Sequence, residues 1–302
     1  MHLARSWKRR LAGTSAVWLA GWGAVFGAGP AAGDPAAPLP PPVPSPVGEA
    51  AAAQVVYALG GARAPGIPWY DYTNRAGAGY FPHAARELID YPAGAPFSWM
   101  PSWLYPGRNQ DHVSIGDAAR QATNSLDTAI RRGTRPAAAV GLSQGTLALD
   151  QEQLRLAHDP TAPPPDLLQF TTIGDPAFGT SFLSHLFAPG SYIPLIDYTM
   201  PQPVESQYAT NRVLAAYDGL ADFPDRPDNL LADLNAGFGA GVVHTPAAFT
   251  GPGDVPRENI RTTVNSRGAT TTTYLIPVQH LPLTLPLRFL GWSDRLVGSS
   301  PL

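Results

Sequence analysis

The chain contains no cysteine, and only 14% of its 302 residues are charged. The lack of cysteine excludes disulfide scaffolds, cysteine metal sites and thiol nucleophiles. The formal net charge of −3 provides no excess of cations for contacting phosphates, so we expect no nucleic-acid partner. The sequence also lacks an H-E-x-x-H motif, a G-x-x-x-x-G-K-[ST] motif and any histidine spacing suited to zinc. We therefore expect neither a metal nor another cofactor.

Apolar residues, by contrast, are plentiful. They make up 44% of the chain, and aromatic residues make up 10%, which is enough for a sizeable core. The 34 prolines and 30 glycines stay below the level of a low-complexity chain. One large folded domain, at residues 50–302, fits this composition best.

The N-terminal residues carry an export signal. Arg5, Lys8, Arg9 and Arg10 precede residues 11–29, which are uncharged and mainly apolar, as in a secretory signal or a membrane anchor. Residues 1–33 are therefore predicted to be a signal peptide or a membrane anchor, with both alternatives open. Residues 34–49 are rich in proline and alanine and should form an extended linker. We expect an exported protein, secreted or attached to the membrane on the cell-envelope side.

Strand and helix patterns alternate in the domain. Short apolar runs predict strands at 54–59, 136–140, 167–173, 212–216 and 270–277, and helical spacing predicts helices at 114–132 and 146–157. This order indicates an α/β fold whose mostly parallel sheet is covered by helices on both faces. Residues 179–206 match neither period, and are either a packed structural insertion or a lid-like wall for an apolar substrate.

Residues 141–145 read GLSQG and match G-x-S-x-G, the nucleophile elbow of α/β-hydrolases. An apolar run precedes this motif and a helical pattern follows it, as the elbow requires. Ser143 is therefore the candidate nucleophile. The oxyanion hole should combine the N–H of Gln144 with that of Gly61 or Ala62 from the loop after the first strand.

The nucleophile needs a histidine as its base. In this fold the base usually follows the last strand, which favours His280 and leaves His244 as the alternative. His158 lies too close to the elbow helix, and His185 lies inside the irregular insertion.

The base in turn needs an acid. Asp222 is favoured because a glycine, acid and proline loop surrounds it, while Asp218 and Asp175 remain alternatives. An acid that is not catalytic would accept backbone N–H bonds in its loop.

Five further segments are VVYALGG, AVGLSQG, TIGDP, YDGLADFPDRPDNLLADLN and TYLIPVQHLPLTLPLR. Together they resemble the PE-PPE-domain serine hydrolases of mycobacteria, which are relatives of the cutinases. The resemblance spans residues 54–288, and its most specific parts are residues 217–235 and the HLPLTLPLR end of the last segment. The loop after Ile173 is less glycine-rich than is usual in that family.

The resemblance implies an activity. A signal or anchor with a proline-rich spacer, in place of a PE or PPE helical domain, resembles members that act as acyltransferases on acylated trehalose glycolipids of the envelope. Other members are carboxylester hydrolases, and a catalytically silent envelope-binding module on the same fold is the remaining alternative. The expected substrate is a lipid ester or glycolipid, attacked by Ser143 with His280 as base and Asp222 as its partner.

Overall fold

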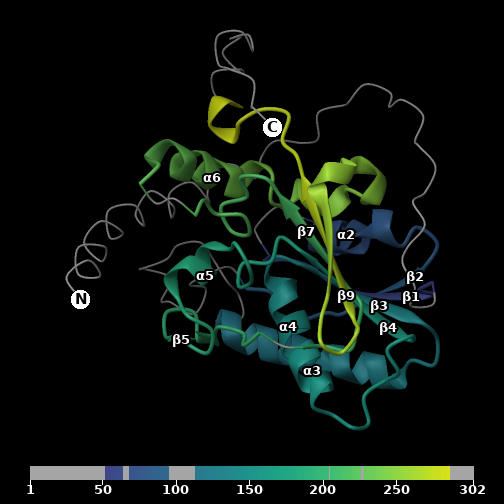
Figure 1. Ribbon diagram of the computed structural model, residues 1–302. Coiled ribbons are helices and arrows are strands. Elements are labelled where there is room, and N and C mark those ends of the chain that lie inside the picture. Colours follow the sequence, from purple (N-terminus) through teal and green to yellow (C-terminus); the bar gives the residue numbers. More distant parts are fainter. Residues whose placement is uncertain (1–51, 64–67, 95–112, 204, 226–227, 286–302) are drawn as a thin grey trace.

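The computed structural model describes residues 52–63, 68–94, 113–203, 205–225 and 228–285 (Figure 1). The predicted signal or anchor and the linker lie outside these ranges. Within them, no helix is both long enough and apolar enough to cross a bilayer.

A seven-stranded sheet forms the centre of the domain (Figure 1). The strand order is β2-β1-β3-β4-β7-β9-β8, and all neighbours are parallel except β8 and β9. The five predicted strands are confirmed as β1, β3, β4, β7 and β9. The edge strands β2 and β8 were not predicted, because they are short or exposed and carry charged residues. The bounds are β1 Val55–Leu59, β2 Ala85–Leu88, β3 Ala137–Leu142, β4 Leu168–Ile173, β7 Thr210–Ala215, β8 Ile260–Val264 and β9 Thr270–Ile276.

Helices cover both faces of the sheet, as predicted. Alternate residues of β1 and β3 point to opposite faces and form two cores. One core packs against α3 (Ile115–Arg132) and α4 (Gln144–Ala157), and the other packs against the 3-10 turn η2 (Pro246–Phe249). The remaining helical elements are α2 Trp69–Arg75, α5 Phe182–Leu186, α6 Leu230–Val242, η1 Ala78–Tyr80, η3 Pro252–Asp254, η4 Arg257–Asn259 and η5 Pro282–Thr284.

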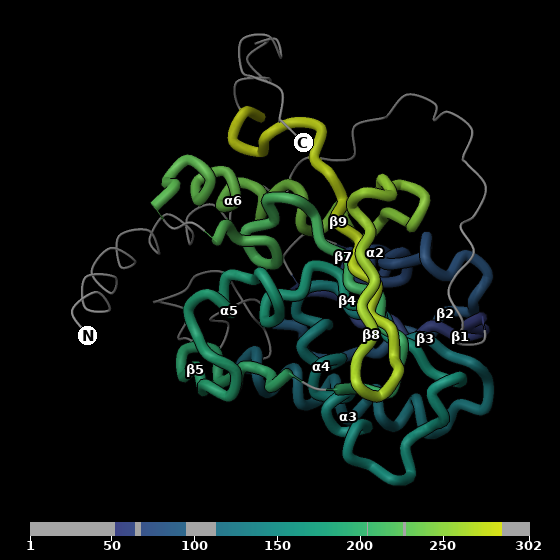
Figure 2. Tube along the Cα trace, viewed as in Figure 1, coloured from purple at the N-terminus to yellow at the C-terminus, as the bar shows by residue number. Residues whose placement is uncertain are grey.

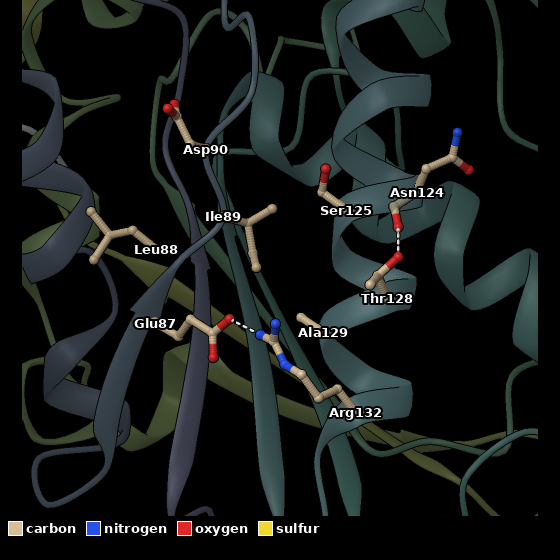
Figure 3. Close-up of a pocket in the computed structure, with 9 residues that line it drawn as sticks. All are labelled: Glu87, Leu88, Ile89, Asp90, Asn124, Ser125, Thr128, Ala129 and Arg132. Carbon is tan, nitrogen blue, oxygen red and sulfur yellow. Dashed lines mark hydrogen bonds and ion pairs between the residues drawn. The ribbon is translucent and has the colours of Figure 1, made fainter.

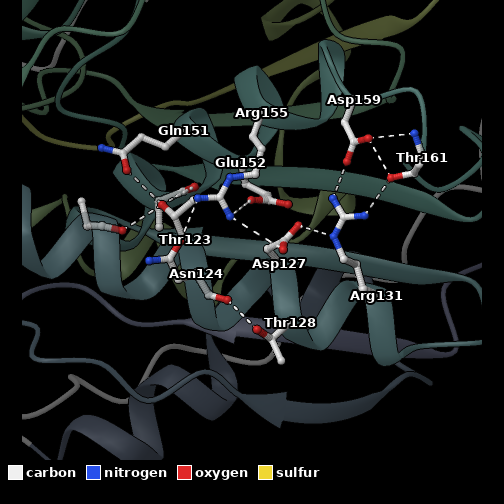
Figure 4. Close-up of polar contacts among 12 residues, drawn as sticks. Thr123, Asn124, Asp127, Thr128, Arg131, Gln151, Glu152, Arg155, Asp159 and Thr161 are labelled. Atoms are coloured by element: carbon white, nitrogen blue, oxygen red, sulfur yellow. Dashed lines mark hydrogen bonds and ion pairs between the residues drawn. The ribbon is translucent and has the colours of Figure 1, made fainter.

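Polar contacts fasten α4 to α3 (Figure 4). Arg131 pairs with Asp127 at 2.8 Å on its own helix and with Asp159 at 2.5 Å, just beyond the end of α4. Glu152 is fully buried between the two helices, 3.5 Å from Arg155. Burial, assisted by the charge of Asp127, raises the pKa of Glu152 to about 8, and Arg155 offsets only part of this. The helix that follows Ser143 is therefore held firmly.

The irregular insertion at residues 179–206 packs against the start of α3. It contains α5 and a short hairpin of β5 (Tyr192–Ile193) and β6 (Tyr198–Thr199). Asp197, in the hairpin turn, accepts hydrogen bonds from Ser114 at 3.0 Å, Arg120 at 2.7 Å and Tyr192 at 2.7 Å. The segment is thus a packed part of the domain. In Figure 2, α5 and β5 lie on the left of the view, below α6.

Candidate active site

Ser143 lies at a sharp turn between β3 and α4. Its backbone has φ 52° and ψ −119°, a strained conformation for a residue with a side chain. Its N–H donates to the carbonyl of Ile173 at 2.8 Å, and its carbonyl accepts the N–H of Thr146 at 2.9 Å. The strand, turn and helix that a nucleophile elbow requires are therefore present.

The two glycines of the motif are required by close packing. A Cβ atom at Gly145 would lie 2.6 Å from the carbonyl oxygen of Leu59, and one at Gly141 would lie 2.8 Å from the backbone of Gly145. Real Cβ atoms do not approach backbone this closely. The spacing G-x-S-x-G is therefore what allows α4 to turn back against β1.

A buried histidine and a buried aspartate form a short hydrogen bond. Nδ1 of His244 lies 2.6 Å from Oδ2 of Asp218, and both side chains are buried. A carboxylate only accepts, so Nδ1 carries the proton and Nε2 has its lone pair available. That Nε2 atom has no hydrogen-bond partner among the described residues. The other oxygen of Asp218 accepts the N–H of Leu220 at 3.0 Å, which fixes the carboxylate.

Gly174 connects this pair to the elbow. It directly follows Ile173, whose carbonyl binds the N–H of Ser143, and it has φ 60°. A Cβ atom there would lie 2.7 Å from Cε1 of His244 and 3.5 Å from Oδ2 of Asp218. The imidazole therefore lies against the strand end next to the one that carries Ser143.

The favoured pair from the sequence, Asp222 and His280, is not formed within the described residues. The carboxylate of Asp222 instead accepts the N–H of Tyr217 at 3.1 Å and the hydroxyl of Thr180 at 3.4 Å. Burial raises the pKa of Asp222, and the bond from Tyr217 opposes this. Among the described residues, these partners of the carboxylate thus lie in loops and include no histidine, unlike the expected pairing with His280.

His280 forms no comparable pair with a carboxylate among the described residues. It follows β9, which is three strands away from β3 in the sheet. Its Nδ1 is buried and has no partner among the described residues. His244 reaches the strand end beside β3 because α6, which rests on the loop after β7, leads into it before the chain enters β8.

The predicted oxyanion loop lies beside the nucleophile. A Cβ atom at Gly61 would lie 3.1 Å from the Cβ of Ser143. The carbonyl of Gly61 is held by Nε1 of Trp69 at 2.7 Å and by the hydroxyl of Tyr72 at 3.1 Å. In the described part of the chain, the N–H groups of Gly61, Ala62 and Gln144 donate to no loop or turn carbonyl. The contact of Gly61 with Ser143 matches the placement that an oxyanion hole needs.

The other sequence candidates lie elsewhere. His158 contacts the carbonyl of Leu154 at the end of α4, and His185 contacts exposed Asp225 at 3.1 Å. Asp175 is buried beside Asp150, and burial raises the pKa of both carboxyls. Among the described residues, neither histidine is hydrogen-bonded to a buried carboxylate.

A hollow of about 400 Å³ lies at the edge of the sheet, between β2 and α3 (Figure 3). An ion pair between Glu87 and Arg132 spans it. None of its lining residues belongs to the elbow, the oxyanion loop or the histidine pair. Within the described ranges, no group of histidines and carboxylates is arranged to hold a metal ion.

Comparisons with known proteins identify the family of this chain. The family model described as "PE-PPE domain" matches residues 82–299. Diacyltrehalose acyltransferase Chp2 of Mycobacterium tuberculosis (strain ATCC 25618 / H37Rv) is 68% identical over 300 residues, which cover 96% of this chain and 84% of that protein. SL1278 acyltransferase Chp1 of the same strain is 46% identical, over 70% of this chain and 50% of its own length. Esterase PE16, also of that strain, is 31% identical, over 67% of this chain and 40% of its own length.

Proposed function

Because the chain belongs to the PE-PPE domain family, we propose that it is a serine acyltransferase that acts on acylated trehalose-type glycolipids. The family resemblance and the α/β-hydrolase fold expected from the sequence are confirmed. The proposed triad is Ser143, His244 and Asp218. The observation that carries it is the buried His244 to Asp218 hydrogen bond, lying on Gly174 at the strand end beside the elbow.

The proposed reaction has two halves. Nε2 of His244 takes the proton of the Ser143 hydroxyl as the oxygen attacks the ester carbonyl, and the oxyanion is held by N–H groups of Gln144 and of Gly61 or Ala62. Collapse of this intermediate breaks the ester bond. The leaving alcohol takes the proton from His244, and an acyl-serine remains. A second hydroxyl then gives its proton to His244 and attacks the acyl-serine. The bond between the acyl group and Ser143 breaks, and His244 returns the proton to the serine oxygen, which restores Ser143.

The acceptor decides between the two enzymatic alternatives. Transfer to a sugar hydroxyl makes the protein an acyltransferase, as Chp2 is named, whereas transfer to water makes it an esterase, as PE16 is named. The high identity to Chp2 over nearly the whole chain favours a sugar acceptor. Water exclusion from the acyl-enzyme is the physical requirement for that outcome.

A fluorophosphonate probe tests the activated serine. We expect Ser143 to be labelled in the wild type, and labelling to fall by roughly a thousandfold in His244→Ala, because the residual reactivity of a serine without its base is small. His280→Ala should label normally and serves as the matched control. Normal labelling of His244→Ala together with loss in His280→Ala would reinstate the other histidine. An unlabelled wild type would favour a silent binding module.

Product analysis tests the acceptor. Purified protein incubated with a monoacylated or diacylated trehalose should yield both a more-acylated and a less-acylated product. Free fatty acid formed together with a less-acylated trehalose, and without any more-acylated product, would identify an esterase instead.

We also propose export and envelope attachment through residues 1–33, which rests on their sequence pattern. Cell fractionation of the full chain, compared with a chain in which the four N-terminal cations are replaced by glutamine, tests this. Recovery of the unaltered protein in the cytoplasm would refute it.

A further inference from the structure

Helix α6 exposes its large apolar residues and buries its small and polar ones. The buried positions are Asn235, Ala236 and Gly239. The exposed large side chains are Leu230 at 61%, Leu231 at 67%, Leu234 at 42% and Phe238 at 46%. We call these four the α6 stripe. A helix in a globular domain normally has the opposite arrangement.

The α6 stripe is continuous along the helix. Leu230, Leu234 and Phe238 are spaced four residues apart and therefore lie one above the other on a single face. Scattered surface leucines are ordinary, but a stripe of adjoining large apolar side chains indicates an interaction surface.

The helix is tightly fixed to the proposed catalytic pair. A Cβ atom at Gly239 would lie 1.7 Å from the carbonyl oxygen of Tyr217, so α6 rests directly on the loop that carries Asp218. Oδ1 of Asn235 also accepts the N–H of Leu283 at 3.0 Å. At its other end, α6 leads through Val243 into His244. The stripe is thus presented on the same rigid unit as the base and its acid.

The charges of the helix indicate which kind of surface it contacts. Interfacial helices that bind anionic lipids carry lysine and arginine on their polar face. Helix α6 has no lysine or arginine, and Asp233 lies in its first turn. A negatively charged membrane is therefore disfavoured, while an uncharged lipid surface meets no electrostatic opposition.

We propose that the α6 stripe docks the enzyme onto a neutral lipid surface, so that ester groups in that surface meet His244 and Ser143. The inference rests on the proposed function, because a lipid ester is the expected substrate. The apolar side chains enter the acyl region at its boundary with the headgroups, and the buried face of the helix remains on the acid loop.

The absence of cysteine allows a site-specific test on the full chain. In the variant Leu234→Cys, an environment-sensitive fluorophore is attached to the new thiol on the stripe. In the control variant Val264→Cys, the same fluorophore is attached at another exposed apolar position, on β8. Phosphatidylcholine vesicles should shift the emission to the blue at position 234 and leave position 264 unchanged, equally in 0.15 M and 0.5 M salt. No vesicle-induced shift at position 234 would overturn the proposal. Blue emission that is already present without lipid would also overturn it. If that emission depends on protein concentration, a second copy of the chain covers the stripe, and if it does not, another segment of the same chain covers it.

Kinetics provide the second readout. In the doubly substituted variant Leu231→Gln with Phe238→Gln, kcat/KM for an ester presented in vesicles should fall roughly tenfold or more, because two large apolar contacts with the lipid are lost. Turnover of a soluble short-chain ester and fluorophosphonate labelling should stay at the wild-type level, and Val264→Gln should resemble the wild type in every assay. An equal loss on soluble and vesicle substrates would place the stripe in the catalytic pocket and overturn docking. If wild-type Ser143 does not react with the probe, the proposed function fails, while the fluorescence shift still decides whether the stripe docks.

Discussion

Replacing Gly174 by alanine perturbs the proposed base without removing any catalytic group. The residue has φ 60°, where a side chain costs about 1–2 kcal/mol of stability. The added Cβ atom would also lie 2.7 Å from Cε1 and 2.9 Å from Nδ1 of His244. Relief of that contact moves the ring by several tenths of an ångström to about 1 Å, and a displacement of that size near the reacting atoms lowers kcat about 100-fold.

A second glycine separates the two effects. Gly179 has φ 64°, but a Cβ atom there meets nothing within 4 Å. Gly179→Ala should therefore lose the same 1–2 kcal/mol in a urea unfolding experiment while keeping its activity. The assay is kcat on a soluble ester, measured with the rate of fluorophosphonate labelling of Ser143. If the folded Gly174→Ala protein keeps the wild-type kcat and the wild-type rate of labelling, the reasoning that His244 acts as the base beside Gly174 is refuted.

Four further substitutions test the account. Asp218→Asn should lower kcat by roughly 10³–10⁴, because the carboxylate that orients His244 is lost. Asp222→Asn should leave kcat near the wild-type value. Steady-state kinetics distinguish the two variants, and the reverse ranking would restore Asp222 as the acid. The folded-state pKa of Glu152, about 8, lies above the ordinary 4.5. The free energy of unfolding of the wild type therefore falls as pH rises from about 4.5 to about 8, by at most on the order of 5 kcal/mol. Glu152→Gln should remove this part of the pH dependence. Denaturant unfolding at pH 5 and pH 9 measures this, and an equal slope in both proteins would contradict it. Ser114→Ala should cost about 1–2 kcal/mol in the same assay, because its hydroxyl accepts the N–H of Asp117 at 2.9 Å and starts α3; an unchanged unfolding midpoint would show that this cap contributes nothing.

The parts of the molecule that were predictable are those specified by neighbouring residues. Apolar runs identify the five inner strands, and helical spacing with Ser114 as its N-cap identifies α3. The motif around Ser143 predicts the elbow, because only glycine fits two positions before and after it. Such signals are local, so they can be recognised in the sequence without knowledge of the fold.

The edge strands and the insertion were harder to predict from the sequence. Strand β8 is exposed at most of its positions, so it shows no apolar alternation. The insertion takes its structure from Asp197, which joins it to α3 across a long stretch of chain. The need for glycine at position 239 also could not be predicted, because it comes from the carbonyl of Tyr217, against which α6 presses.

The amino-acid order was sufficient to nominate a serine, two histidines and three aspartates, because chemistry restricts which residue types can serve in each role. It could not select among them. Which aspartate meets which histidine depends on the order of strands in the sheet and on the path of α6 across their ends, and both are set by packing between residues far apart in the chain. The pairing of His244 with Asp218 exists because α6 lies on the loop after β7 and delivers the imidazole to the end of β4, next to the strand that bears Ser143.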